Sequence, residues 1–347
     1  MEMPVPFKVK ELSQILDVST PAVSQRLKNM TSVLLKSEKN RTVGIPRETI
    51  AKILTENGHG YFYRKNIFIS TTIVGGSSKT VSSWSLFNAF LRISSKKNPI
   101  IIISTDSQSS IDDIALGKIP APEDQKVLVD YFSGQASIEE IILPINKDEN
   151  TWIISSSLNN VFLDKALSDP KKIKTEALRL ITDIYKKFPN TNPSIFIDTM
   201  PALSASTGSF LLAMSQLMKE LTPEQYNPVV CIPLRSDSTS LKGAEIGVSE
   251  LHNILETFGV NTKPQIKIFL ANYDKRLSLS SEILKNLFSN PILKDYVADT
   301  IIRTSSEVPK TAYHHKSIFH DKLPAVASDY NDLLLELLGH EKQGANA

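Results

Sequence analysis

The chain has 347 residues, of which 41% are hydrophobic and 22% are charged, so it can bury a substantial core, and its length favours one large domain with a smaller one. The absence of a run of about 18 apolar residues, and of an apolar stretch near the N-terminus, argues against a membrane partner and predicts a cytoplasmic protein. A single cysteine, Cys231, excludes an internal disulfide and a thiolate-rich metal site.

Positive charge is concentrated at the beginning of the chain. Residues 1–66 hold eleven Lys and Arg against six Asp and Glu, a net +5, although the whole chain carries only +2. A small basic segment ahead of a larger domain favours nucleic acid as a partner, whereas solvated charges alone are the simpler explanation.

Residues 9–30 have the spacing of two helices joined by a short turn. Leu12, Ile15 and Leu16 form an apolar stripe, residues 17–19 suit a turn, and Val23 with Leu27 forms the inner face of a second helix. Thr20 is the predicted N-cap, with Pro21 in the first turn. This pattern predicts a helix-turn-helix.

The polar positions of the second helix suit base edges and phosphates in a major groove. They are Thr20, Ser24, Gln25 and Lys28. A helical hairpin that only packs on its neighbour has the same pattern. A third helix is expected within 45–60, and the segment 29–44 between them fits a wing or a loop. We therefore predict a DNA-binding domain over residues 1–64.

From residue 65 to 347, apolar runs alternate with amphipathic segments. The pattern predicts strands at 66–71, 98–105, 150–157, 192–199, 227–234, 265–272 and 298–304, and helices near 79–95, 123–133, 171–187, 207–220, 240–258, 280–289 and 329–338. Several runs are apolar without alternation, as in strands covered on both faces. The expected fold class is α/β, with a mostly parallel sheet between layers of helices.

A glycine-containing loop follows the first of these strands and leads into a helix. Its candidate phosphate-binding residues are Gly75, Gly76, Ser77, Ser78, Lys79, Thr80 and Val81. Ile73 holds the place of the first glycine of a strict Walker A loop, and Gly-Gly can be a simple turn. The layout nevertheless predicts backbone N–H groups and Lys79 on phosphates, and Thr80 on Mg²⁺.

Other strands end in polar residues that reach the same sheet edge. Asp106 and Asp198 are candidate magnesium-site residues together with Thr80, although a carboxylate at a strand end also caps helices. Asn272 is a candidate reader of the base, and its alternative role is to turn the chain. The pattern predicts a nucleotide site that takes ATP with Mg²⁺.

Five ordered motifs carry a family resemblance: "GGSSKT", "IIIISTDSQSSIDDIALG", "SIFIDTMPAL", "VVCIPLRSDSTSLKGAEIGVSEL" and "IIRTSSEVPKTAYHHKSIF". With them the chain resembles the ParA family of partition ATPases, the deviant Walker A group that includes MinD. Its N-terminal helix-turn-helix pattern is similar to that of the longer plasmid type. The resemblance covers nearly the whole chain.

That resemblance implies specific roles. Lys79 matches the phosphate-binding lysine and a catalytic position, Thr80 the magnesium position, and Asp198 the Walker B aspartate. Asp106 matches the aspartate to which the family assigns activation of the attacking water, and Arg303 the place of a basic residue for nonspecific DNA. Arg303 could instead tie a strand end to the core.

Three positions depart from the family pattern. Val74 replaces the signature lysine that in this family reaches the nucleotide of the other subunit, Ser104 replaces the first aspartate of the middle motif, and Met200 replaces the first proline after Asp198. Without this lysine, ATP-driven dimerisation, hydrolysis or both are expected to be impaired.

The sequence therefore predicts a ParA-type ATPase for plasmid or chromosome partition that binds DNA, forms a homodimer, associates with the nucleoid and represses its own operon. The resemblance implies a ParB-like, centromere-binding partner. The alternative is a transcriptional repressor that senses nucleotide and hydrolyses it weakly or not at all. A metabolic enzyme of the same fold is disfavoured by the predicted DNA-binding segment.

Overall fold

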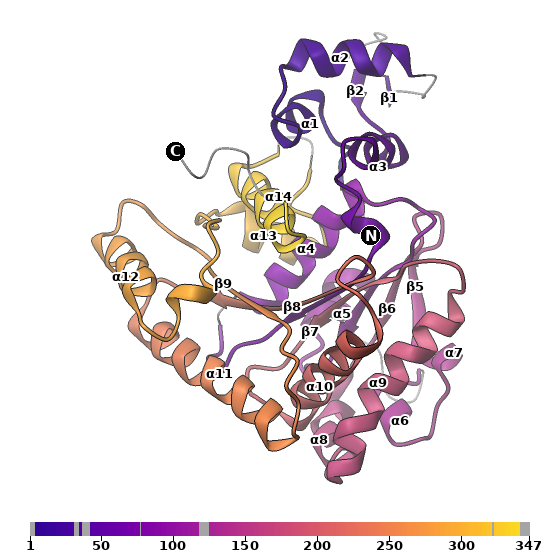
Figure 1. Cartoon of the computed structure of the whole chain (residues 1–347), viewed down its shortest axis with the longest axis vertical. Helices are drawn as coiled ribbons and strands as arrows, with labels where there is room; N and C mark the ends of the chain where they lie inside the picture. The colour runs from indigo at the N-terminus through magenta and orange to yellow at the C-terminus, as the bar shows by residue number, and fades with distance from the viewer. Residues whose placement is uncertain are drawn as a thin grey trace.

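A seven-stranded sheet forms the centre of the larger part of the chain (Figure 1). This computed structural model describes residues 4–30, 35–36, 42–76, 78–117, 125–320 and 323–340. The strand order in the sheet is β5-β6-β4-β7-β3-β8-β9. The strands are β3 Lys65–Ser70, β4 Ile100–Ser104, β5 Ile142–Asn146, β6 Thr151–Ile154, β7 Ser194–Asp198, β8 Tyr226–Leu234 and β9 Gln265–Leu270. All neighbours are parallel except the edge strand β5, which runs antiparallel to β6.

The central strands are buried on both faces, which explains their continuous apolar runs. In β4, Ile100 and Ile102 belong to one core cluster, and Ile101 and Ile103 belong to the other. The strand register places Asp198 beside Ser70 on one side and beside Ser104 on the other, so the carboxyl ends of three strands meet at one edge.

Helices cover both faces of the sheet (Figure 1). One cluster contains residues of α4 Lys79–Ile93 and α14 Ala325–Leu337, and the other contains residues of α9 Pro170–Lys187, α10 Ala205–Glu220, α11 Ser238–Thr257 and α12 Ser278–Ser289. Shorter helices are α5 Ser110–Leu116, α6 Leu128–Phe132, α7 Ile138–Ile141, α8 Leu163–Ala166 and α13 Glu307–Tyr313, with 3₁₀ turns η1 Tyr61–Tyr63, η2 Leu158–Phe162 and η3 Lys294–Tyr296. None of the described helices is long and apolar enough to cross a bilayer.

The N-terminal part forms a small helical unit that projects from the sheet-containing part (Figure 1). It contains α1 Val9–Ile15, α2 Thr20–Asn29 and α3 Arg47–Glu56, with the short antiparallel pair β1 Leu35–Lys36 and β2 Thr42–Gly44 between α2 and α3. Val23 and Leu27 of α2 are buried, as their spacing predicts. The N-cap of α2 is Ser19, whose hydroxyl accepts from the Ala22 N–H at 3.4 Å.

Buried polar contacts join the two parts. The Arg92 guanidinium of α4 is 1% exposed and bonds both carboxylate oxygens of Glu11, at 2.8 and 2.9 Å. It also donates to the backbone oxygen of Val5 and lies over the Phe7 ring. Burial of this guanidinium without Glu11 would be costly, so the pair fixes α1 against α4.

The expected fold class and the order of its main helices are confirmed, while the short helices α5, α7, α8 and α13 were not expected and four further points differ. Segment 298–304 is not a strand: Arg303 forms only an isolated bridge to Tyr273, because amides of this segment bond carboxylates of α14, including Glu336 and Asp329. Thr20 is the first residue of α2 and not its N-cap. Strand β5 was not anticipated, since Pro144 interrupts its run. The helix expected at 123–133 is shorter, and residues 118–124 lie outside the described part.

Candidate functional site

The loop between β3 and α4 lies at the carboxyl edge of the sheet. Gly75 and Gly76 are exposed, and Gly76 has φ +69°. Ser78 also has a positive φ, +68°, and precedes the first residue of α4. Left-handed backbone at this point turns the chain sharply from strand to helix. Val81 lies in the first turn of α4, and Ser77 is outside the described residues.

The Asp198 carboxylate contacts this helix directly. Thr80 donates its hydroxyl to Asp198 Oδ2 at 2.8 Å, and Ser83 donates to Oδ1 at 3.2 Å. Burial raises the pKa of Asp198 to about 7, although these hydrogen bonds and the Lys79 charge act to lower it. A fully buried carboxylate next to a hydroxyl is a donor set suited to Mg²⁺ and its water.

Lys79 begins α4 and its side chain is buried (7% exposed). Burial lowers the pKa of its ammonium group, while the carboxylates of Asp198 and Asp106 act to raise it. Lys79, Asp198 and Asp106 therefore share one electrostatic environment at the strand ends. A buried cation at a helix N-terminus is suited to an anionic ligand with several oxygens.

Asp106 follows β4 and is only half-buried. Its Oδ1 accepts from the Gln108 N–H at 2.9 Å, and its backbone oxygen lies 2.6 Å from the Ser156 hydroxyl. Ser156 also contacts Ser104 at 2.7 Å and the Asp112 carboxylate at 3.0 Å. Burial raises the pKa of Asp112 to about 6. This polar cluster holds the backbone of Asp106 at the end of β4.

Val74 is packed into a notch on α11. A β-carbon placed on Gly243 would lie 2.4 Å from Val74 Cγ2, and one placed on Gly247 would lie 3.9 Å from Ile73. The absence of a side chain at Gly243 is therefore what allows Val74 to approach the helix. Val74 anchors the loop to its own subunit, and the sequence alone did not indicate this contact.

Asn272 lies just beyond β9 in a left-handed conformation, φ +63°. Its side-chain Nδ2 donates to the Ser78 hydroxyl at 2.8 Å, which brings the exposed Asn272 next to the loop. The prediction that Asn272 turns the chain agrees with this conformation, and its contact with Ser78 also places it at the candidate site.

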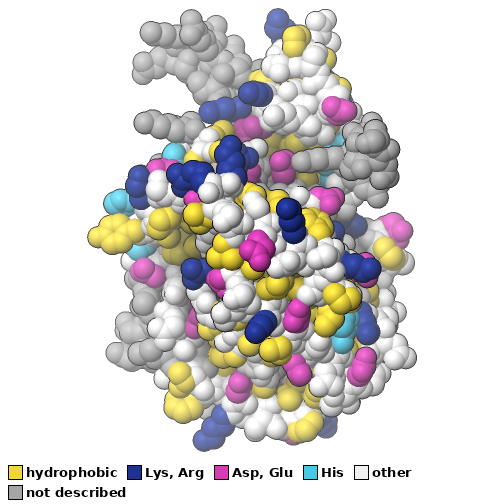
Figure 2. Space-filling model, turned by 90° about the vertical axis from the view of Figure 1, so that its left-hand side faces the viewer, with side chains coloured by type: hydrophobic (Ala, Val, Ile, Leu, Met, Phe, Trp, Pro, Cys, Tyr) yellow, Lys and Arg dark blue, Asp and Glu magenta, His cyan; other side chains and the backbone are white. Residues whose placement is uncertain are grey.

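Arg303 lies at the same edge, beyond the loop that contains Asn272. Its guanidinium bonds both carboxylate oxygens of Asp329 on α14, at 2.6 to 3.1 Å, while its side chain stays 56% exposed. Arg303, Lys275 and Arg276 line a hollow of 420 Å³. On the face drawn in Figure 2, several Lys and Arg side chains lie close together and others are scattered. The Asp329 ion pair favours a structural role for Arg303, and contact with DNA stays a prediction.

On α2 the predicted DNA-contacting residues differ in accessibility. Gln25 and Lys28 are exposed. The Ser24 hydroxyl donates to the Thr20 backbone oxygen at 2.9 Å, and the Thr20 hydroxyl lies 3.3 Å from that of Ser13 on α1. Thr20 is exposed as well and Ser24 is half-buried, but the hydroxyls of both are engaged within the unit, so Gln25 and Lys28 stay the main candidates for contact with a partner.

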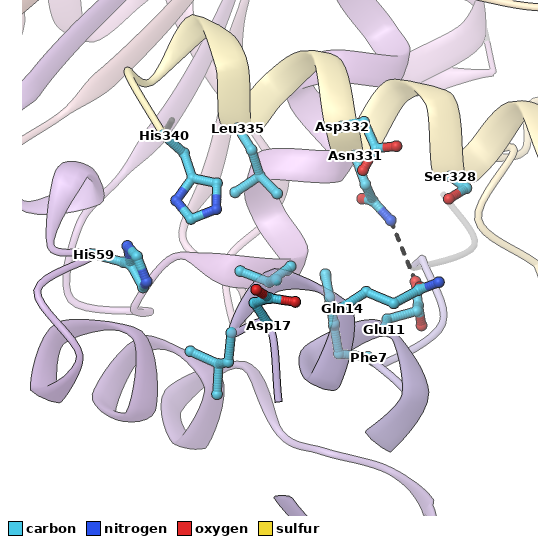
Figure 3. Close-up of a pocket in the computed structure, with 12 residues that line it drawn as sticks. Phe7, Glu11, Gln14, Asp17, His59, Ser328, Asn331, Asp332, Leu335 and His340 are labelled. Atoms are coloured by element: carbon cyan, nitrogen blue, oxygen red, sulfur yellow. Dashed lines mark hydrogen bonds between the residues drawn. The ribbon is translucent and has the colours of Figure 1, made fainter. Parts of the chain in front are cut away.

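A separate cavity of about 340 Å³ lies where α1 meets α14 (Figure 3). Glu11 and Asn331 face each other across it, with Asn331 Nδ2 donating to Glu11 Oε1 at 3.2 Å. His59 and His340 stand at its other end, their ring centroids 4.6 Å apart. None of its lining residues belongs to the loop at 71–80, so this cavity is part of the junction between the two parts of the chain.

The structure brings together the loop, Lys79, Thr80, Asp106, Asp198 and Asn272. It also places there a residue that sequence reasoning missed: Arg235, the residue after β8. A β-carbon placed on Gly76 would lie 3.5 Å from Arg235 Nη1. The sequence could have indicated Arg235, because this residue directly follows an apolar run whose end reaches the same sheet edge.

Comparison with known proteins gives one curated relative of note, and no protein-family model matches the chain. A ParA family protein of Chlamydia trachomatis serovar D is 26% identical over 271 residues, which are 76% of this chain and 94% of that protein. This is similarity over most of both chains.

Solved structures show the same fold. Apo McdA of Cyanothece has a TM-score of 0.62 at 14% identity over 79% of this chain and 99% of McdA. A plasmid partition protein of Borrelia burgdorferi bound to AMPPNP has a TM-score of 0.59 at 17% identity over 79% of this chain and 98% of its own. Cobyrinic acid a,c-diamide synthase of Mycobacterium smegmatis, with bound ADP and magnesium, has a TM-score of 0.54 at 17% identity over 72% of this chain and 91% of its own. These likenesses show a fold that a partition protein and a biosynthetic enzyme share.

Proposed function

We propose that the chain is a ParA-type ATPase that binds ATP with Mg²⁺ at the loop between β3 and α4 and acts in plasmid or chromosome partition. The observation that carries this proposal is the contact of Thr80 with the buried Asp198 at 2.8 Å, beside the buried Lys79. Supporting it are the likeness to a ParA family protein and to partition proteins.

The residues fit a nucleotide and its metal. The N–H groups at the start of α4 and the Lys79 ammonium would hold phosphate oxygens, and the Thr80 hydroxyl would turn from Asp198 to the metal. Mg²⁺, when bound, neutralises negative charge on the phosphates. The Asp106 carboxylate would orient the attacking water, and Asn272 would lie near the base.

DNA is the proposed macromolecular partner. Gln25 and Lys28 on the exposed side of α2 would read an operator, and Arg303, Lys275 and Arg276 around their shared hollow would bind DNA without sequence preference. A ParB-like protein would stimulate turnover, and the chain would act as a homodimer in the cytoplasm on the nucleoid. The Glu11–Arg92 contact would link the nucleotide-binding helix α4 to the DNA-binding unit.

The alternative function is a repressor that senses nucleotide and hydrolyses it weakly. Val74 favours this alternative, because it packs on Gly243 and places no positive charge across a dimer interface. Lys79, Thr80, Asp106 and Asp198 favour the ATPase.

ATP turnover by the full chain, with and without DNA, separates these two. The ATPase proposal expects turnover that DNA or a centromere-binding partner raises and that Asp106→Ala removes without loss of ATP binding. Lys79→Ala should lose binding itself. Wild-type protein that binds ATP, represses an operator and shows no turnover under any of these conditions would establish the repressor instead.

A further inference from the structure

The candidate nucleotide loop lacks one positive charge that a triphosphate would use. Val74 cannot supply it, since valine carries no charge and its side chain packs in the Gly243 notch. Lys79 is the buried cation of the loop, and a nucleotide with Mg²⁺ still carries excess negative charge. A further cation beside the loop would therefore have a clear function.

Arg235 is in position to provide that charge. Strand β8 pairs directly with β3 in parallel, so the residue after β8 emerges next to the loop that follows β3. The Arg235 guanidinium reaches over Gly76, where a β-carbon would lie 3.5 Å from Nη1. Its side chain is 53% exposed, so a ligand at the loop can reach it.

Asp237, at the N-terminus of α11, lies on one side of this guanidinium. Asp237 is the N-cap of α11 and accepts from the Ser240 N–H at 2.7 Å, so its carboxylate is held in place. Arg235 Nε lies 3.6 Å from Asp237 Oδ2. The Nε side therefore faces Asp237, and the Nη side faces the loop.

We propose that Arg235 is a phosphate-binding residue of this site, its Nη groups donating to phosphate oxygens of a nucleotide held in the same subunit. This inference rests on the proposed nucleotide-binding function. A planar guanidinium suits the task because it offers two parallel donors to a phosphate and stays charged. Helix α11 thus borders the site at two points: its N-cap Asp237 lies beside Arg235, and its Gly243 receives Val74.

The test is direct nucleotide binding by the full chain, using a fluorescent ATP analogue with Mg²⁺. Arg235→Gln should weaken binding by about tenfold or more, as expected for loss of a charge-assisted hydrogen bond, and Arg235→Lys should recover part of the loss. The dependence of affinity on salt should also fall in Arg235→Gln, because one ionic contact is gone.

Lys263→Gln is a matched control. Lys263 is a weakly paired surface cation, 3.8 Å from Glu256 and 42% exposed, but it precedes β9 and so lies at the opposite edge of the sheet. Its replacement should leave affinity within about twofold of wild type.

The outcomes of this test distinguish the role of Arg235 from the proposed nucleotide-binding function. Wild-type binding that is lost in Lys79→Ala yet unchanged in Arg235→Gln would overturn the role of Arg235 alone. Wild-type protein that binds no nucleotide would overturn the proposed function, and this inference with it. A folded Arg235→Gln protein, checked by circular dichroism, with weakened binding and a reduced salt dependence supports the assignment.

Discussion

Replacing Gly243 by alanine tests the packing of the candidate nucleotide loop. The new β-carbon would lie 2.4 Å from Val74 Cγ2, whereas carbon atoms in contact are normally about 3.5–4.0 Å apart. Because valine has few χ1 choices, the loop backbone must move away from α11 by about 1 Å. Overpacking of this kind costs about 1–3 kcal/mol in the free energy of unfolding. Displacing the loop should also weaken ATP binding.

The assay is urea unfolding of wild type, Gly243→Ala and Gly247→Ala, together with ATP titration of each. Gly247→Ala is the control, since its β-carbon would meet Ile73 at an ordinary 3.9 Å and alanine favours a helix. Val74→Ala added to Gly243→Ala should restore stability and binding. If Gly243→Ala is as stable as Gly247→Ala and binds ATP equally, Val74 does not occupy the notch as described.

Three further outcomes are expected. Burial raises the Asp198 pKa to about 7, so between about pH 4 and 7 the folded protein keeps a proton that the unfolded chain releases. In the absence of nucleotide and Mg²⁺, the free energy of unfolding should therefore fall as the pH rises from about 4 to 7. Asp198→Asn should flatten this pH dependence in urea unfolding. An unchanged pH dependence in Asp198→Asn would contradict the raised pKa of Asp198. Glu11→Gln leaves the Arg92 guanidinium buried without its carboxylate and should lower the free energy of unfolding by about 3 kcal/mol in the same assay. An unchanged free energy of unfolding would show that this pair does not hold the junction. In operator binding, Gln25→Ala should change base preference, and Lys28→Ala should lower affinity for all sequences and the salt slope by about one, whereas unchanged affinity in both would remove α2 as the reading helix.

The parallel sheet was predictable because its strands are short, buried on both faces and separated by amphipathic helices. Local pattern could not predict the course of segment 298–304, whose amides bond carboxylates of α14 about 26 to 37 residues further along the chain. The same applies to the edge strand β5, where Pro144 obscures the strand pattern.

The site was predictable where one short motif contains the residues, as with Lys79 and Thr80. The site was less predictable where residues distant in sequence come into contact only in the folded protein. The contact of Val74 with Gly243 joins positions 169 residues apart, and neither residue type signals it. Arg235 carried a signal in its place at a strand end, but its approach to Gly76 depends on the pairing of β8 with β3.

The central claim is that the loop between β3 and α4 binds a nucleotide through Lys79. Calorimetric titration of MgATP into the full-length wild type and into Lys79→Ala tests it most directly. The account predicts saturable binding at one nucleotide per chain in the wild type and none in Lys79→Ala, with both proteins folded by circular dichroism. Absence of binding to the wild type, or equal affinity of both proteins, would contradict it.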